Sequence, residues 1–161
     1  MEITNFNEYL EELCRRHIDI RHEENGVHFV DSEDKKDTSL DSVLCYPAVI
    51  LSKGSYHYNG DAVRYAKEHE YMLFVVDHVS DTSDYDQIRV KMNKCELIID
   101  ELFNKIIEDK RQRKHPFLIG FTLSGIDVDP VENKDNSLYG HLAVFSLEKS
   151  YQSISCRKAF R

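Results

Sequence analysis

The feature that most constrains this chain is a long run of apolar residues at helical spacing. Steps of three and four positions alternate through Tyr85, Ile88, Met92, Cys95, Ile99, Leu102 and Ile106. This spacing predicts an amphipathic helix over about residues 83–113, with Ser83 or Asp84 as its N-cap and Pro116 beyond its end. A shorter helix is predicted over 6–17, where Asn5 is a good N-cap and Glu8 can close a capping box.

Apolar or alternating runs predict the strands of a sheet. They lie at 48–52 after Pro47, at 71–79, at 117–124 with a bulge at Ser124-Gly125, at 139–147 and, as a last edge strand, at 151–160. Short links between neighbouring strands favour antiparallel pairing. The sequence therefore predicts an α+β fold. Its sheet is mostly antiparallel, with the N-terminal helix and the long central helix together on one face.

The segments between these elements are predicted with less regular structure. Asn25-Gly26 is typical of a two-residue hairpin turn, because both residues tolerate positive φ. Residues 31–41 are predicted as a mobile acidic loop, 53–60 as a turn or excursion and 127–137 as a polar loop. Residues 61–70 fit either a short helix or an extended arm.

Length and charge limit the class of protein. The chain has 161 residues and we expect a single domain over 1–161. Lysine and arginine total 21 against 29 acidic residues, a net charge of −8, which disfavours nucleic acid and anionic membranes as partners. No secretory signal or spanning segment is apparent, so we expect a soluble protein made in the cytoplasm, with Cys14, Cys45, Cys95 and Cys156 as free thiols.

No motif for a reaction is present in the sequence. The eight histidines lack metal-binding spacing, and Leu123-Ser124-Gly125 lacks the first glycine of a nucleophile elbow. The acids after Gly125 (Asp127, Asp129 and Asp135) lack the glycine and terminal glutamate of a calcium loop. We therefore predict no catalytic residues, no metal ligands and no cofactor.

Two charged segments are candidates for contact with partners. Lys110, Arg111, Arg113 and Lys114 crowd the end of the long helix, where cations also oppose the helix dipole. Asp31, Glu33, Asp34 and Asp37 make the loop after the predicted hairpin acidic. Such a bipolar surface favours head-to-tail contacts between copies, which close into rings when the rotation allows.

The layout resembles a known family. An N-terminal helix is followed by a polar loop, a Tyr46-Pro47-Ala-Val-Ile-Leu strand, a strand ending near Asp77, the long helix and a Phe-rich strand, and finally by Leu138-Tyr139-Gly140-His141-Leu-Ala-Val-Phe145. In this order the chain resembles the tail terminator (tail-completion) proteins of long-tailed bacteriophages and prophages, and the related minor tail and neck proteins. The Asn25-Gly26 hairpin and the 53–70 excursion depart from that pattern.

The resemblance implies a virion assembly protein without catalysis. It implies self-assembly into a six-membered ring that caps the tail tube and joins it to the head, with tail tube or neck proteins as partners. Two alternatives remain open at this stage. One is a small bacterial enzyme or ligand-binding domain, whose site would gather His57, Tyr58, His78 and His141. The other is an adaptor that pairs a sheet edge with a partner strand.

Overall fold

A computed structural model describes residues 2–32, 44–61 and 63–150 of the chain. The elements in order are α1 (Phe6–Arg16), β1 (Val27–Asp31), β2 (Leu44–Gly60), β3 (Tyr65–His78), α2 (Tyr85–Arg111), a short 3₁₀ helix η3 (Pro116–Leu118), β4 (Asp127–Asn133) and β5 (Leu138–Ser150). No helix among these residues is long and apolar enough to cross a membrane. The predicted edge strand at 151–160 lies outside the described residues.

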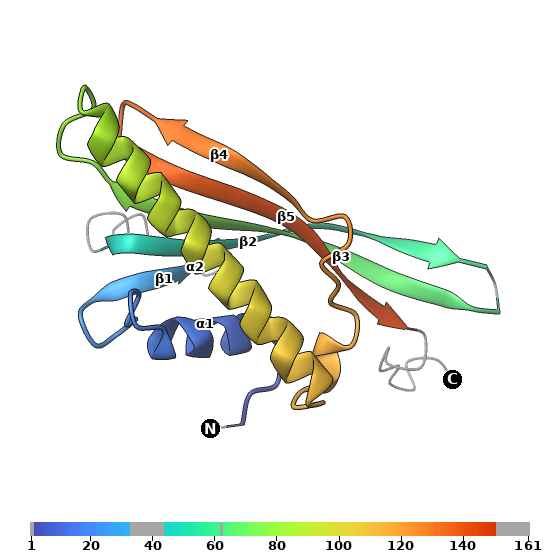
Figure 1. Cartoon of the computed structure of the whole chain (residues 1–161). Helices are drawn as coiled ribbons and strands as arrows, with labels where there is room; N and C mark the ends of the chain where they lie inside the picture. The colour runs from blue at the N-terminus through green and yellow to red at the C-terminus, as the bar shows by residue number, and fades with distance from the viewer. Residues whose placement is uncertain (1, 33–43, 62, 151–161) are drawn as a thin grey trace.

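The strands form one sheet in the order β1-β2-β3-β5-β4. β1 pairs parallel with β2, and the other three pairings are antiparallel. Both helices cover the same face of this sheet (Figure 1), and their buried residues belong to one core. The predicted α+β class, with a mostly antiparallel sheet and two helices on one face, is confirmed.

The two helices form where their apolar stripes predict. The Asn5 side chain accepts the Glu8 amide at 3.0 Å, and Asp84 accepts the Gln87 amide at 3.1 Å. The carboxylate of Glu8 reaches back to the Thr4 amide at 2.9 Å rather than to Asn5. Cys14 and Cys95 are buried free thiols, as the stripes indicate, and burial raises the pKa of Cys95 to about 12.

An aromatic cluster holds the helices on the sheet. The Phe145 ring of β5 lies 5.7 Å from Phe6 of α1, 5.6 Å from Tyr71 of β3 and 5.7 Å from Phe103 of α2. Phe121, from the segment after η3, also packs 5.7 Å from Phe145. Phe145 is therefore the residue at which four separate parts of the chain meet.

The predictions for residues 18–26, 117–124 and 127–133 are wrong. Residues 18–26 make turns rather than one arm of a hairpin, because β1 finds its partner in the distant β2 and buries Phe29 there. Residues 117–124 are not a strand: Leu118 and Phe121, three positions apart, are buried, whereas Ile119 is 71% exposed. Residues 127–133 form strand β4, not a loop, because they pair with β5.

The segment predicted as a turn or excursion is instead continuous strand. β2 runs on through residues 53–60 with a bulge between Lys53 and Tyr56, and β3 begins at Tyr65. Of the two predictions for 61–70, the extended one is correct from Tyr65 onward. Together these residues make a hairpin that extends past both helices (Figure 1).

Candidate functional site

The basic run at the end of α2 is partly used inside the fold. Lys114 contacts the buried Asp109 carboxylate at 2.9 Å, and Lys110 donates to the Phe121 carbonyl at 2.5 Å. Arg111 and Arg113 are exposed and form no ion pair with the residues that the structure describes. Only these two arginines remain available, so the predicted cationic patch is half as large as the sequence suggests.

Asp109 explains why Lys114 turns inward. Its carboxylate, 3% exposed, accepts the Tyr9 hydroxyl at 2.9 Å and contacts Lys105 at 3.1 Å. Burial raises the pKa of Asp109, but hydrogen bonds from Lys114, Tyr9 and Lys105 outweigh it and lower that pKa overall. The cluster ties α1 to α2 and is structural.

The predicted acidic loop is described only at its first member. Asp31 is the last residue of β1 and its carboxylate accepts the side-chain amide of Asn7. Glu33, Asp34 and Asp37 lie outside the described residues, so their part in a contact stays a prediction.

The residues of the enzyme alternative do not converge. His57 lies opposite Glu68 on β3, and His78 ends the same strand, about 33 Å away at ~3.3 Å per residue. Tyr58 follows His57 on β2. His141 lies near the start of β5, opposite Val75. These side chains therefore cannot form one site within this chain.

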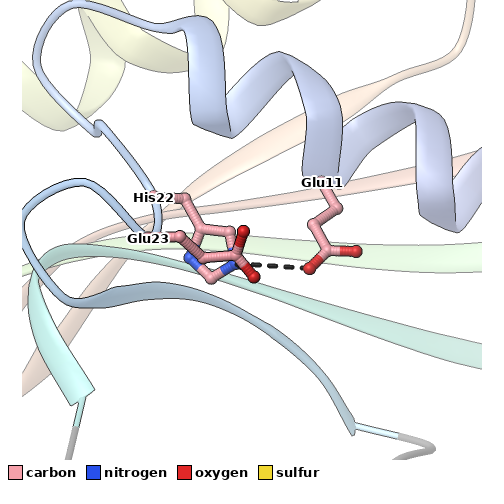
Figure 2. A group of neighbouring side chains, drawn as sticks. All are labelled: Glu11, His22 and Glu23. Carbon is pink, nitrogen blue, oxygen red and sulfur yellow. Dashed lines mark hydrogen bonds and ion pairs between the residues drawn. The ribbon is translucent and has the colours of Figure 1, made fainter. Parts of the chain in front are cut away.

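The structure brings together a cluster that the sequence did not predict: Glu11, His22 and Glu23 (Figure 2). The Nδ1 atom of His22 accepts two backbone amides, from His28 and Phe29, each at 3.1 Å. Its ring proton must therefore reside on Nε2, which donates to Glu11 at 3.3 Å. A metal ion would need a free lone pair on Nε2, so this histidine is held in the wrong tautomer for a ligand.

Both carboxylates of this cluster also already contact a cation. Arg15 contacts Glu11 at 3.0 Å and Glu23 at 2.7 Å, and its hydrogen bond lowers the pKa of Glu23. The cluster therefore fastens the 18–26 turns to α1, and Arg15 already contacts the carboxylates that a metal ion would need.

A second cluster, around His17, has the same arrangement of a histidine between a backbone amide and a glutamate. His17 Nε2 lies 2.7 Å from Glu101, while its Nδ1 accepts the Asp19 amide at 3.2 Å. The proton is again on Nε2, directed at Glu101 of α2. The first cluster therefore joins α1 to the 18–26 turns, and the second joins the end of α1 to α2. In both, the histidine is in a tautomer that cannot bind a metal ion through Nε2.

An open cleft of about 590 Å³ lies between α1 and β1. Phe6, Phe29 and Tyr71 contribute to its lining, and Asn7, Asp31 and Lys53 add polar groups. None of the described residues that line it is a serine, cysteine or histidine, so no pair of nucleophile and base meets there.

Two exposed aromatic side chains lie close together on the hairpin that extends past the helices. We call the arm residues 53–61 and 63–70 together with 146–149 of β5, which pairs alongside. Tyr56 is 52% exposed and Tyr58 is 61% exposed, with their rings 5.9 Å apart. The ammonium of Lys67 lies 4.0 Å from the centre of the Tyr56 ring.

The arm could have been found from the sequence. Asn59-Gly60 is a second hairpin signal, and alternation flanks it on both sides: Tyr56 and Tyr58 before it, Tyr65, Lys67 and His69 after it. The signal was missed because the alternating residues are aromatic and charged rather than aliphatic.

The outer edge of the sheet at β4 is poorly suited to strand addition. Its sequence is Asp-Val-Asp-Pro-Val-Glu-Asn, and Pro130 has no amide hydrogen to donate. Acidic residues and a proline are devices that keep edge strands from pairing. The adaptor alternative therefore gains no support from this edge.

No protein-family model matches this chain, and no curated protein matches it. The class of protein that the fold defines is α+β, and function has to be argued from the surfaces described above.

Proposed function

We propose that this protein is a non-enzymatic assembly protein of a long-tailed bacteriophage or prophage. In this proposal it is made in the cytoplasm, forms a ring that caps the tail tube in the virion, and joins that tube to the head. Its partners are further copies of itself and the tail tube or neck proteins. The order of α1, β2, β3, α2 and β5 supports this role, although the Phe-rich segment that the resemblance counts as a strand is not one. The arm, which departs from the family's layout, adds one structural observation.

The arm carries the proposal because Leu147 is the one residue that it contributes to the core of the described residues. Tyr56 and Tyr58 are large aromatic side chains on a strand pair that neither helix covers. Exposed tyrosines on a preformed β-structure lose little conformational entropy on binding, and aromatic residues dominate the energetics of protein interfaces. A surface built in this way favours docking over chemistry.

The proposal is tested by removing the gene from the bacterium that carries it and inducing the prophage. We expect tails and heads that remain unjoined in electron micrographs. A plasmid copy of the gene should restore joined particles, and the protein should then be found in purified particles by mass spectrometry.

Complementation with variants tests the arm itself. The double variant Tyr56→Ser/Tyr58→Ser should fail to restore joined particles. Tyr85→Ser is the matched control, because Tyr85 is 81% exposed at the start of α2 and lies away from the arm. Normal particles in the absence of the gene would refute the proposed function.

A further inference from the structure

The two faces of the arm carry opposite charges. Residues directly opposite one another in the antiparallel pairings point to the same face, and positions two apart along a strand share that face. One face, which we call the lysine face, contains Lys53, Tyr56, Tyr58, Lys67, His69 and Lys149. The other, the glutamate face, contains His57, Asn59, Glu68, Glu70 and Glu148.

The lysine face continues the helix-covered side of the sheet. Lys67, His69 and Tyr71 alternate along β3, and Tyr71 is buried beneath α1 beside Phe145. Burial, followed by the charges of Lys53, Lys67 and Lys149, lowers the pKa of His69. The ammonium groups of all three lysines therefore lie close enough to His69 to act on its ring, and this face is positive at neutral pH.

The glutamate face continues the side of the sheet that no described helix covers (Figure 1). Next to its carboxylates the strands present half-buried apolar residues, among them Met72, Phe74 and Val144. A cleft of about 330 Å³ opens here, with Glu68, Glu70 and Val144 among its lining residues. This side thus combines negative charge, apolar surface and a hollow.

Across β3 and β5 the arm places like charges opposite one another. Lys67 pairs with Lys149 on one face, and Glu68 pairs with Glu148 on the other. Like charges directly opposite across an antiparallel pair destabilise the sheet, whereas exchanging one residue of each pair would make them attractive. This local conflict costs the isolated chain stability, and a surface of opposite charge laid on each face would relieve it.

We propose that the occupant of each face is a second copy of this chain, with the lysine face of one copy stacked on the glutamate face of the next. The lysines then meet carboxylates, and Tyr56 and Tyr58 meet apolar surface and the cleft. Pairing of like faces would bring like charges together, so the contact is head-to-tail rather than two-fold symmetric. The inference rests on the proposed assembly role and names the surfaces that perform it.

Charge reversal tests the pairing in the full-length chain. Variant one is Lys67→Glu/Lys149→Glu, and variant two is Glu68→Lys/Glu148→Lys. Each keeps like charges opposite one another within the arm, so folding should be affected equally little. The mass in solution is measured by light scattering and sedimentation for the wild type, for each variant, for their equimolar mixture and for the chain carrying all four changes.

A head-to-tail contact predicts a distinctive pattern. The wild type forms multimers, and each variant alone falls to the 18.9 kDa of one chain. The equimolar mixture and the fourfold variant both recover the mass of the wild type, because each again places a positive face against a negative one. Arg89→Glu/Lys134→Glu, which replaces two exposed cations outside the arm and changes the net charge as much as variant one, leaves the multimer intact.

Three results would overturn the inference: a monomeric wild type at its highest soluble concentration, multimers that survive both reversals, or loss of the multimer without recovery in the mixture and in the fourfold variant.

The test of this contact can be distinguished from the test of the proposed function. Rescue by complementary charges in a protein that is absent from induced particles would keep the contact and remove the phage role. Normal complementation by variant one would keep the phage role and remove the proposed contact.

Discussion

Strands β2, β3 and β5 run through two environments that differ sharply. Under the helices, Tyr71 stacks on Phe145 with ring centres 5.6 Å apart, and both are buried. In the arm, Tyr56 and Tyr58 lie on the same face of the same sheet and remain 52% and 61% exposed. The strand sequences alternate in a similar way in both halves. Burial on this face is thus decided by where the helices end.

The difference suggests two separate roles. The covered half supplies the core and fixes the fold, while the arm presents side chains outward and contributes little to that core. If this division is correct, substitutions in the covered half change stability, and those in the arm change association. The predictions below test this division, from the largest expected effect to the smallest.

The largest effect is expected from Phe145→Ala in the covered half. Phe145 contacts aromatic rings from α1, β3, α2 and the segment after η3, so truncation leaves a cavity that none of these parts can fill alone. We expect a loss of about 3–5 kcal/mol in the free energy of unfolding, measured in urea. Tyr56→Ala in the arm should cost about 0.5 kcal/mol. Similar losses of unfolding free energy at both positions would show that the covered half and the arm do not have separate roles.

Two glycines sharpen the comparison. A Cβ atom on Gly140 would lie 2.0 Å from the Val75 carbonyl oxygen, inside the covered sheet. Gly140→Ala should therefore force β3 and β5 apart and cost about 1–3 kcal/mol of global stability by thermal unfolding.

At the tip of the arm, Gly60 has φ +105° and its added Cβ would lie 2.1 Å from the Arg64 carbonyl oxygen. Gly60→Ala should introduce strain of about 1–3 kcal/mol at the turn alone. We expect faster amide hydrogen exchange in the arm with little change in the global unfolding transition. A global loss as large as that of Gly140→Ala would show that the arm and the core unfold as one unit.

Asp109→Asn should weaken the tie between the helices by about 1–2 kcal/mol at pH 7. The pKa of Asp109 is lowered in the folded state, so its carboxylate stabilises the fold above about pH 4 and this contribution is lost as the pH falls through the folded-state pKa. Urea unfolding at pH 7 and pH 3 should show a smaller difference between wild type and variant at the lower pH. An equal difference at the two pH values would mean that the charge of Asp109 is not the source of its stabilising effect.

The smallest effect on stability is expected from Tyr56→Ser/Tyr58→Ser. Both side chains are more than half exposed, so the free energy of unfolding should stay within about 0.5 kcal/mol of the wild type. Tyr9→Phe in the covered half removes the hydroxyl bonded to Asp109 and should cost about 0.5–1.5 kcal/mol. A larger loss for the arm variant than for Tyr9→Phe would show that the arm contributes to the core.

The two Asn-Gly pairs show where local signals suffice. Asn59-Gly60 turns a hairpin, because both flanking strands find each other across it. Asn25-Gly26 does not, although Gly26 has φ +120°, because the strand after it pairs with β2 instead. A turn signal permits reversal of the chain, but the pairing of the strands depends on where each can bury its apolar face.

The candidate site was predictable only in part. The exposed Arg111 and Arg113 follow from the sequence, but the inward turn of Lys114 depends on Asp109, which faces Tyr9 of a helix a hundred residues away. The clustering of His22 with Glu11 depends likewise on how the 18–26 turns fold against α1. Neither contact produces a repeating pattern of residues from which it could be predicted.

The sequence by itself determined the two helices, their caps, the α+β class and strands β3 and β5 over most of their length, because amphipathic spacing and runs of β-branched and aromatic residues act locally. Only the tertiary structure decided that β1 pairs parallel with β2, that residues 117–121 reach the core by a 3₁₀ turn, and that like charges face each other across the arm. These features depend on strand register and on contacts between distant segments, which are set by the competition for buried apolar surface across the whole chain.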